Sequence, residues 1–134
     1  MTAEQRLAAA RSGTLGTVTE RNEPHLVPCC FVLIDETIYS AVDGKPKSTM
    51  ALRRLDNIRA QPRASLLVDQ FDEDWTQLWW IRVDGAARVV DSGTEHSAAI
   101  DALVSKYPQY ETMRPTGSVI AIDIRSWRHW DASA

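Results

Sequence analysis

The sequence has no long apolar run and too few cysteines for a disulfide framework. None of its 134 residues lies in a stretch that approaches the roughly 20 apolar residues of a membrane-spanning helix. The N-terminus also lacks the apolar segment of a signal peptide. The two cysteines, Cys29 and Cys30, are adjacent, and a disulfide between neighbours would be strained. We therefore expect a cytoplasmic protein without membrane contact, with two reduced thiols on opposite faces of a strand.

Signatures of metal binding, hydrolysis and nucleic-acid recognition are also missing. The three histidines, His25, His96 and His129, are too far apart in the chain to predict a metal site. No serine lies in a nucleophile-elbow sequence, which argues against a hydrolase. The formal net charge is −3, and no aromatic recognition motif is interleaved with basic residues, so we expect no nucleic-acid partner.

The composition is typical of an ordinary globular protein. Hydrophobic residues make up 44% and charged residues 25% of the chain, close to the average for soluble domains. A chain of this length can bury roughly two-thirds of its unfolded surface without a metal or a disulfide. The sequence contains no internal repeat, low-complexity segment or linker, so we expect one domain over residues 1–134.

The order of the expected elements favours a mainly β (α+β) fold with an antiparallel sheet. Capping boxes at Thr2–Gln5 and Ser92–Glu95 predict two helices, and a third is expected between Ser48 and Pro62. Pro28 indicates an edge strand or a bulge, and Gly85 indicates a bend or bulge. Short turns join most strands, and six strands in so small a domain favour a barrel. The expected strands cover residues 14–19, 25–34, 37–42, 64–69, 77–90 and 118–127.

One stretch reverses the sign of the chain's charge. Residues 43–63 hold six of the fifteen Lys and Arg residues and two acids. Ser48 or Thr49 can cap the helix that follows, and the cations lie on and just before its N-terminus, where free N–H groups favour an anion. A solvated basic face is the alternative. Because Lys45 and Lys47 precede the helix in a turn stiffened by Pro46, we interpret this stretch as a phosphate site.

Several motifs together resemble a known superfamily. They are GTLGTVTE, PHLVP, the Lys-Pro-Lys segment, NIRAQPRASLLVD, DEDW and LWWIRVDGAA, which lie within residues 10–126. This series resembles the pyridoxamine 5′-phosphate oxidase-like superfamily, and more narrowly its small members that use the deazaflavin coenzyme F420. The resemblance implies a six-stranded antiparallel split β-barrel of the FMN-binding type with about three short helices. It also implies a homodimer with cofactor sites at the subunit interface.

The resemblance further implies which residues hold the cofactor. Members of the superfamily bind the cofactor phosphate with a basic pair before a Pro-Arg motif. Counting back from Pro62 without gaps gives Arg53 and Arg54, whereas a longer helix gives Lys45 and Lys47. We favour the two lysines with the Ser48 and Thr49 hydroxyls, supported by Arg53 or Arg54.

Other residues match the part of the superfamily that surrounds the flavin ring. Val27, Pro28 and Cys29 correspond to a strand beside the ring, with barrel packing an open alternative for Val27. Trp75 and Trp80 are expected at the interface or against the ring, and core packing remains open for Trp80.

The expected function is that of an oxidoreductase. Reduced coenzyme F420 would transfer a hydride to an unsaturated small organic molecule, and no catalytic side chain can be named. Pyridoxamine phosphate is not the expected substrate, because the tail Arg125–Trp130 lacks the C-terminal motif of the true oxidases. Two alternatives are an FMN-dependent oxidoreductase of the same fold and a non-catalytic protein that binds a flavin or deazaflavin.

Overall fold

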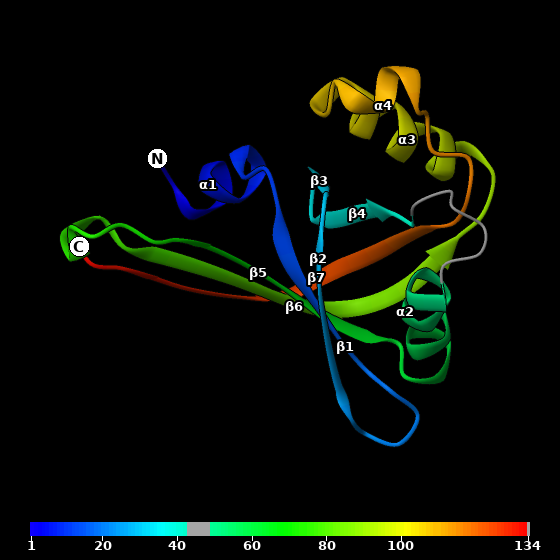
Figure 1. The fold of residues 1–134 in the computed structure, drawn as a ribbon, viewed down its shortest axis with the longest axis horizontal. Coiled ribbons are helices and arrows are strands. Elements are labelled where there is room, and N and C mark those ends of the chain that lie inside the picture. Colours follow the sequence, from blue (N-terminus) through cyan, green and yellow to red (C-terminus); the bar gives the residue numbers. More distant parts are fainter. Residues whose placement is uncertain (43–48, 134) are drawn as a thin grey trace.

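The computed structural model describes residues 1–42 and 49–133 and forms a split β-barrel with helices around it (Figure 1). The sheet is mainly antiparallel and has seven strands in the order β2-β1-β5-β6-β7-β4-β3. The elements in chain order are α1 (Ala3–Ala9), β1 (Gly13–Val18), β2 (Pro24–Cys29), β3 (Val32–Ile34), β4 (Thr37–Ala41), α2 (Thr49–Ala60), β5 (Arg63–Gln70), the 3-10 helix η1 (Trp75–Gln77), β6 (Trp79–Val90), α3 (Thr94–Lys106), α4 (Gln109–Thr112) and β7 (Val119–Asp131).

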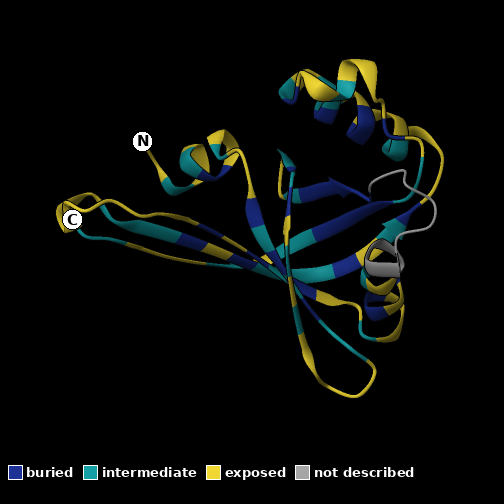
Figure 2. Cartoon of the chain, in the orientation of Figure 1, coloured by how far each residue is buried: buried dark blue, intermediate teal, exposed yellow. Residues whose placement is uncertain are grey.

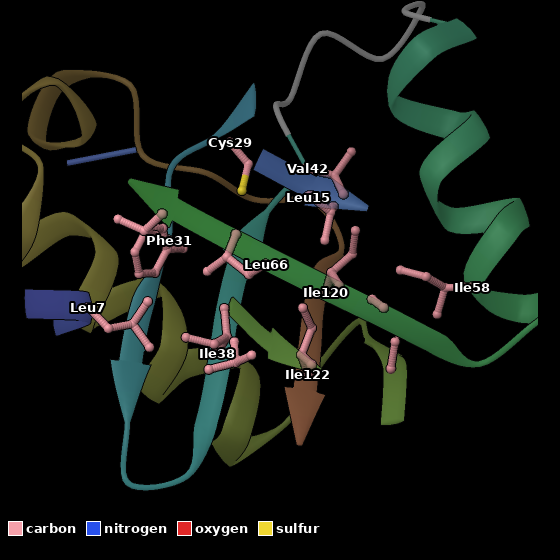
Figure 3. Close-up of a cluster of buried hydrophobic side chains, with 14 of the residues drawn as sticks. Leu7, Leu15, Cys29, Phe31, Ile38, Val42, Ile58, Leu66, Ile120 and Ile122 are labelled. Atoms are coloured by element: carbon pink, nitrogen blue, oxygen red, sulfur yellow. The ribbon is translucent and has the colours of Figure 1, made fainter. Parts of the chain in front are cut away.

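The barrel interior is filled by alternate residues of the strands. Leu15 on β1, Leu66 on β5 and Ile122 on β7 are at most 1% exposed and belong to one cluster. Figure 3 shows these side chains converging, together with Phe31 and Cys29. Successive side chains of a strand point to opposite faces of the sheet, so every second residue lies in the interior. The barrel core therefore occupies the space between the sheet, α1 and α2.

A second apolar cluster lies where α3 packs on the sheet. Ala99, Ile100 and Leu103 of α3 are buried against Val119 and Ala121 of β7. The spacing of the three α3 residues places them on one helix face. Figure 1 shows α3 and α4 on a different side of the barrel from α2.

Three long strands extend from the barrel as an arm. β5, β6 and the second half of β7 continue away from α2, and the C-terminal end of β7 lies at the far end of this arm (Figure 1). The arm is paired over its whole length, since Gln70 pairs with Trp79, and Trp79 pairs with Asp131. Near the base of the arm, the register between β6 and β7 shifts at Asp84/Gly85, which confirms the predicted bulge.

Local signals near the N-terminus are confirmed. Thr2 and Gln5 form the predicted reciprocal capping box at the start of α1. The strand β2 that contains Pro28 is an edge of the sheet, where a residue without a backbone N–H is tolerated. No helix in the described ranges is long and apolar enough to cross a membrane.

Two details of the expected elements are wrong. The run 25–34 forms two strands, because the pairing stops after Cys29 and resumes at Val32; the described residues therefore form seven strands instead of six. The Ser92–Glu95 capping box does not form, and Gly93 occupies the N-cap of α3 without a side-chain hydrogen bond. The Glu95 carboxylate instead accepts hydrogen bonds from Arg88 and Tyr39, which come from two strands.

Candidate functional site

Helix α2 is fixed on the barrel by its apolar face and by a buried polar contact. Leu55 and Ile58 are 5% and 1% exposed. Between them, the buried Asn57 side chain donates a 3.0 Å hydrogen bond from Nδ2 to Oγ1 of Thr17 on β1. Just beyond the helix, the Gln61 side chain donates to the backbone oxygen of Thr19 at 2.6 Å. These contacts fix the rotation of α2 and so determine where its arginines point.

Arg54 lines a small pocket between α2 and the edge of the barrel. The cavity has a volume of about 230 Å³ and is bounded by β2, the end of β4 and α4. The Arg54 Nε is buried and has no hydrogen-bond partner in the part of the chain that the structure describes. A buried donor without an acceptor is costly, so this guanidinium fits an acceptor brought by a ligand. We call this cavity the Arg54 pocket; its lining is Ser12, Pro28, Cys29, Cys30, Ala41, Arg54 and Tyr110.

The two cysteines have different surroundings although both line the Arg54 pocket. Cys29 belongs to the barrel interior, whereas Cys30 packs against the cluster beneath α3. The two thiols thus face different ways as predicted, but β2 ends at Cys29, so Cys30 does not lie on the strand. Burial raises the pKa of Cys29 to about 11, and this effect outweighs the opposing influence of the Ser40 hydrogen bond and of Arg54. The Cys29 side chain is therefore a neutral thiol at neutral pH, which makes it a wall of the pocket and a poor nucleophile.

A second cation, Lys106, lies close to the cysteines. Lys106 at the end of α3 donates from Nζ to the backbone oxygen of Phe31 at 2.9 Å and lies over the Phe31 ring at 4.2 Å. Burial lowers the Lys106 pKa to about 8, with a further contribution from Arg11. Sequence analysis did not identify Lys106, because a single lysine in the last turn of a helix is an ordinary feature.

Arg53 points to a different place from Arg54. It is exposed and lines a polar groove of about 760 Å³ between α2 and the β1–β2 turn. The charges in this groove are balanced, because three arginines face three acids. The charged residues are Arg21, Arg53, Arg59, Glu20, Glu23 and Asp56.

Some predicted phosphate contacts fall outside the described residues. Lys45, Lys47 and Ser48 lie in the segment that the structure leaves undescribed, and so does the side chain of Thr49. The backbone of Thr49 is the first residue of α2. Their part in the site therefore stays a prediction.

The other predicted site residues lie in two separate regions. Val27 packs against the barrel interior, as the barrel-packing alternative predicts. Trp75 is 70% exposed in η1, where β5 turns into β6, and the half-buried Trp80 pairs with Trp130 on the arm. Figure 1 shows this end of the arm on the opposite side of the molecule from α2. One copy of the chain thus brings Pro28, Cys29 and Arg54 together but keeps both tryptophans apart from them.

An apolar groove on the outer face of the sheet was not predicted. It has a volume of about 710 Å³, and strand pairing explains its shape, because Gly16 on β1 lies between Leu26 on β2 and Ser65 on β5. The only signal in the sequence is the small residues at outward positions, and these become neighbours only through the strand register. We call this cavity the outer groove; its lining is Gly16, Thr17, Val18, Pro24, Leu26, Arg63, Ala64, Ser65, Asp84, Gly85, Ala86, Arg125 and Ser126.

Polar and charged side chains interrupt the apolar lining of the outer groove, among them Ser65, Asp84, Arg63 and Arg125. The Ser65 hydroxyl donates to Asp84 Oδ1 at 2.5 Å, and Arg82 forms an ion pair with the same carboxylate. Arg63 and Arg125, in contrast, form no ion pair with any described residue. Within the described ranges, no group of three or more His, Cys, Asp or Glu side chains is placed to hold a metal ion.

Comparison with known proteins agrees with this architecture. A family profile described as pyridoxamine 5′-phosphate oxidase matches residues 2–131. No curated protein matches the chain. Among solved structures, the conserved hypothetical protein Rv2991 of Mycobacterium tuberculosis superimposes with a TM-score of 0.79 at 23% identity, covering 98% of this chain and 86% of that one.

Two further structures with the same fold carry names that mention cofactors. An FAD-binding protein from Mesorhizobium loti has a TM-score of 0.73 and 20% identity, with 96% of this chain and 94% of that chain covered. The heme storage protein HutZ from Vibrio cholerae has a TM-score of 0.71 and 13% identity, with coverages of 96% and 92%. At such identities the likeness establishes the fold alone.

Proposed function

Because the chain belongs to the pyridoxamine 5′-phosphate oxidase family, we propose that it is an oxidoreductase that binds the deazaflavin coenzyme F420. The observation that carries this proposal is the meeting of Arg54, Pro28 and Cys29 in one pocket. These residues were expected at the cofactor from two separate motifs, which lie on β2 and on α2. The Lys-Pro-Lys and DEDW segments favour the deazaflavin over other cofactors.

The residues around the Arg54 pocket fit an anionic, ring-bearing cofactor. The unpartnered Arg54 Nε offers a charged hydrogen bond to a phosphate or carboxylate oxygen. Pro28, exposed on the sheet edge, presents a flat apolar surface without a backbone donor, which suits the edge of a ring. Lys45, Lys47, Ser48 and Thr49 would add phosphate contacts at the start of α2.

The coenzyme supplies the redox chemistry when it is bound, by carrying a hydride to an unsaturated organic substrate. The task of the chain is to bind and orient the ring and to keep water from it. The neutral Cys29 thiol contributes an uncharged wall. No Asp, Glu, His or Lys is among the described residues that line the Arg54 pocket, and solvent would serve as the source of the proton that completes the reduction.

We further propose that the functional unit is a homodimer with the cofactor at the subunit interface. The support is the exposure of apolar side chains on the outer face of the sheet: Leu26 is 71% and Leu67 39% exposed. Both lie outward on neighbouring parts of the sheet. Surfaces of this kind commonly mark protein interfaces.

A flavin is the second candidate cofactor. The structure from Mesorhizobium loti is named as an FAD-binding protein, and FMN carries a terminal phosphate that would suit the same basic residues. The alternative from another class is a non-catalytic protein that binds either cofactor, because the fold does not by itself establish turnover.

The test is an assay of the oxidation of reduced coenzyme F420 by the purified protein with a panel of enones, quinones and nitro compounds. We expect substrate-dependent loss of the reduced coenzyme, and the same rate with an exposed-surface control such as Arg114→Gln. Tight binding without turnover on any panel member would support the non-catalytic alternative. Turnover with reduced FMN in place of reduced F420 would support the flavin alternative.

A further inference from the structure

The tip of the arm carries exposed aromatic and acidic side chains. Phe71 and Trp75 are 67% and 70% exposed. Between them, Asp72, Glu73 and Asp74 are exposed, and none of them forms an ion pair with a described residue. Figure 2 shows this turn as an exposed end of the molecule. We call residues 71–75 the arm tip.

The arm tip is held in a defined shape. The Asp74 carboxylate accepts hydrogen bonds from the backbone N–H and the hydroxyl of Thr76, at 3.1 and 2.7 Å. The Gln70 side chain donates across the turn to the backbone oxygen of Gln77 at 2.9 Å. Covering an exposed aromatic side chain with another surface lowers the free energy, so the arm tip is suited to insertion.

The outer groove has the complementary features. Its lining is mostly small and apolar, and its wall includes the exposed Leu26. Arg63 and Arg125 line it without an ion pair among the described residues. Asp84, the one acid of the lining, is already paired with Arg82. An aromatic side chain therefore fits the apolar lining, and an acidic segment fits beside Arg63 and Arg125.

The arm tip cannot reach the outer groove of its own chain. Ser65 lines the groove, and Phe71 follows the end of the same strand β5. Six residues of extended strand separate the two by about 20 Å, and pairing with β6 keeps the strand straight. A second copy related by a two-fold axis can receive the arm tip. In such a dimer the tip of each copy lies in the outer groove of its partner, because a two-fold interface uses the same patches on both copies.

We infer that the outer groove receives the arm tip of a second copy of this chain, with Trp75 and Phe71 against its apolar lining and the acidic residues beside Arg63 and Arg125. The exposed Leu67 and Trp130 lie on the sheet between the two patches and would be covered in the same interface. This inference rests on the homodimer proposed above and specifies its contacts.

The arrangement also explains the separation of the predicted site residues. Leu26 of the outer groove and Pro28 of the Arg54 pocket point outward on the same strand β2, two residues apart, which is about 7 Å. An arm tip seated in the groove therefore brings Trp75 of one copy beside the Arg54 pocket of the other. Trp75 thus becomes part of a site that one chain alone leaves incomplete.

The experiment uses reciprocal charge reversal and measures mass. One variant reverses the tip, Asp72→Lys with Glu73→Lys, and leaves the capping residue Asp74 intact. The other reverses the groove, Arg63→Glu with Arg125→Glu. Analytical ultracentrifugation at low salt gives the dimer dissociation constant of the wild type, of each variant and of their equimolar mixture. Circular dichroism verifies that both variants are folded.

The wild type is expected to sediment as a dimer of 15.0 kDa chains, and each variant alone to dissociate at least about tenfold more readily. In the mixture, a reversed tip meets a reversed groove at one contact and a natural tip meets a natural groove at the other. The mixture should therefore regain dimers. A monomeric wild type, two variants with unchanged dissociation constants, or a mixture that stays monomeric would each overturn the inference. Because the readout is mass, a failure to bind coenzyme F420 would count against the proposed function and leave this inference standing.

Discussion

Arg53 and Arg54 are neighbours in the chain, yet they line different pockets. Arg54 borders the small pocket with Pro28 and Cys29, whereas Arg53 borders the charge-balanced groove beside the β1–β2 turn. The anchoring of α2 through Asn57 and Ile58 sets this difference. Counting along the sequence does not say which of the two arginines supports the cofactor phosphate. Their positions in the fold favour Arg54.

The first prediction compares the two arginines. Arg54→Gln should weaken binding of the cofactor about tenfold or more, because a hydrogen bond to a charged group contributes about 1.5 to 3 kcal/mol. Arg53→Gln changes the same charge one residue away and should change the affinity less than about threefold. Fluorescence titration with the cofactor measures both. Equal losses in the two variants would mean that general charge, and not the Arg54 pocket, attracts the ligand.

The second prediction concerns two glycines on the sheet. A Cβ at Gly85 would lie 2.1 Å from the backbone oxygen of Asp123, which cannot move without disturbing the pairing of β6 and β7. Gly85→Ala should therefore lower the free energy of unfolding by about 3 kcal/mol or more. At Gly16 the nearest atom is the end of the exposed Leu26 side chain at 3.3 Å, so Gly16→Ala should cost less than about 1 kcal/mol. Urea unfolding measures the free energy of unfolding of both variants. Equal losses would show that the backbone of Asp123 does not restrict position 85.

The third prediction tests the anchor of α2. Asn57→Ala removes the hydrogen bond to the buried Thr17 hydroxyl and should lower the free energy of unfolding by about 1 to 3 kcal/mol. The exposed neighbour Asp56 supplies the control, since Asp56→Ala should change it by no more than about 0.5 kcal/mol. Thermal or urea unfolding is the measurement. If Asn57→Ala unfolds like the wild type, the polar contact does not fix the helix.

The fourth prediction follows from the lowered pKa of Lys106. Its pKa is about 8 in the fold and 10.5 as the ordinary value, so between these pH values the unfolded chain binds more protons than the folded chain. The free energy of unfolding should therefore rise with pH through this window. Cys29 acts in the opposite sense, because its pKa rises from 9.0 to about 11 on folding and stability is lost as pH increases between these values. The two effects are separable below pH 9.

The measurement for Lys106 is urea unfolding at pH 7, 8 and 9 for the wild type and for Lys106→Met. The wild type should gain stability relative to the variant as the pH rises. Parallel pH dependences would show that burial does not disfavour the charged lysine.

Sequence analysis succeeds where the signal is local or concerns the strand pattern. The Thr2–Gln5 capping box, the bulge at Gly85 and the edge position of Pro28 each depend on a few neighbouring residues and the backbone rules that govern them. The mainly β fold was predicted from alternating runs joined by short turns, and the barrel from the number of strands expected in so small a domain; the observed sheet agrees with both. The family resemblance extends this to the split barrel.

Features that depend on distant contacts could not be predicted in this way. Glu95 has the spacing of a capping residue, but Arg88 and Tyr39 approach it from other elements and take its carboxylate. The outer groove exists only because register places Gly16 between Leu26 and Ser65. The direction of Arg54 likewise depends on how α2 rests on the barrel.

The most direct test of the account is a fluorescence titration of cofactor-free protein with coenzyme F420 and, separately, with FMN. We predict micromolar binding of the deazaflavin, weaker binding of FMN, and loss of deazaflavin affinity in both Arg54→Gln and Lys47→Ala. Tighter binding of FMN would contradict the deazaflavin assignment. Binding of neither cofactor would mean that the Arg54 pocket and the basic stretch serve no cofactor of this kind.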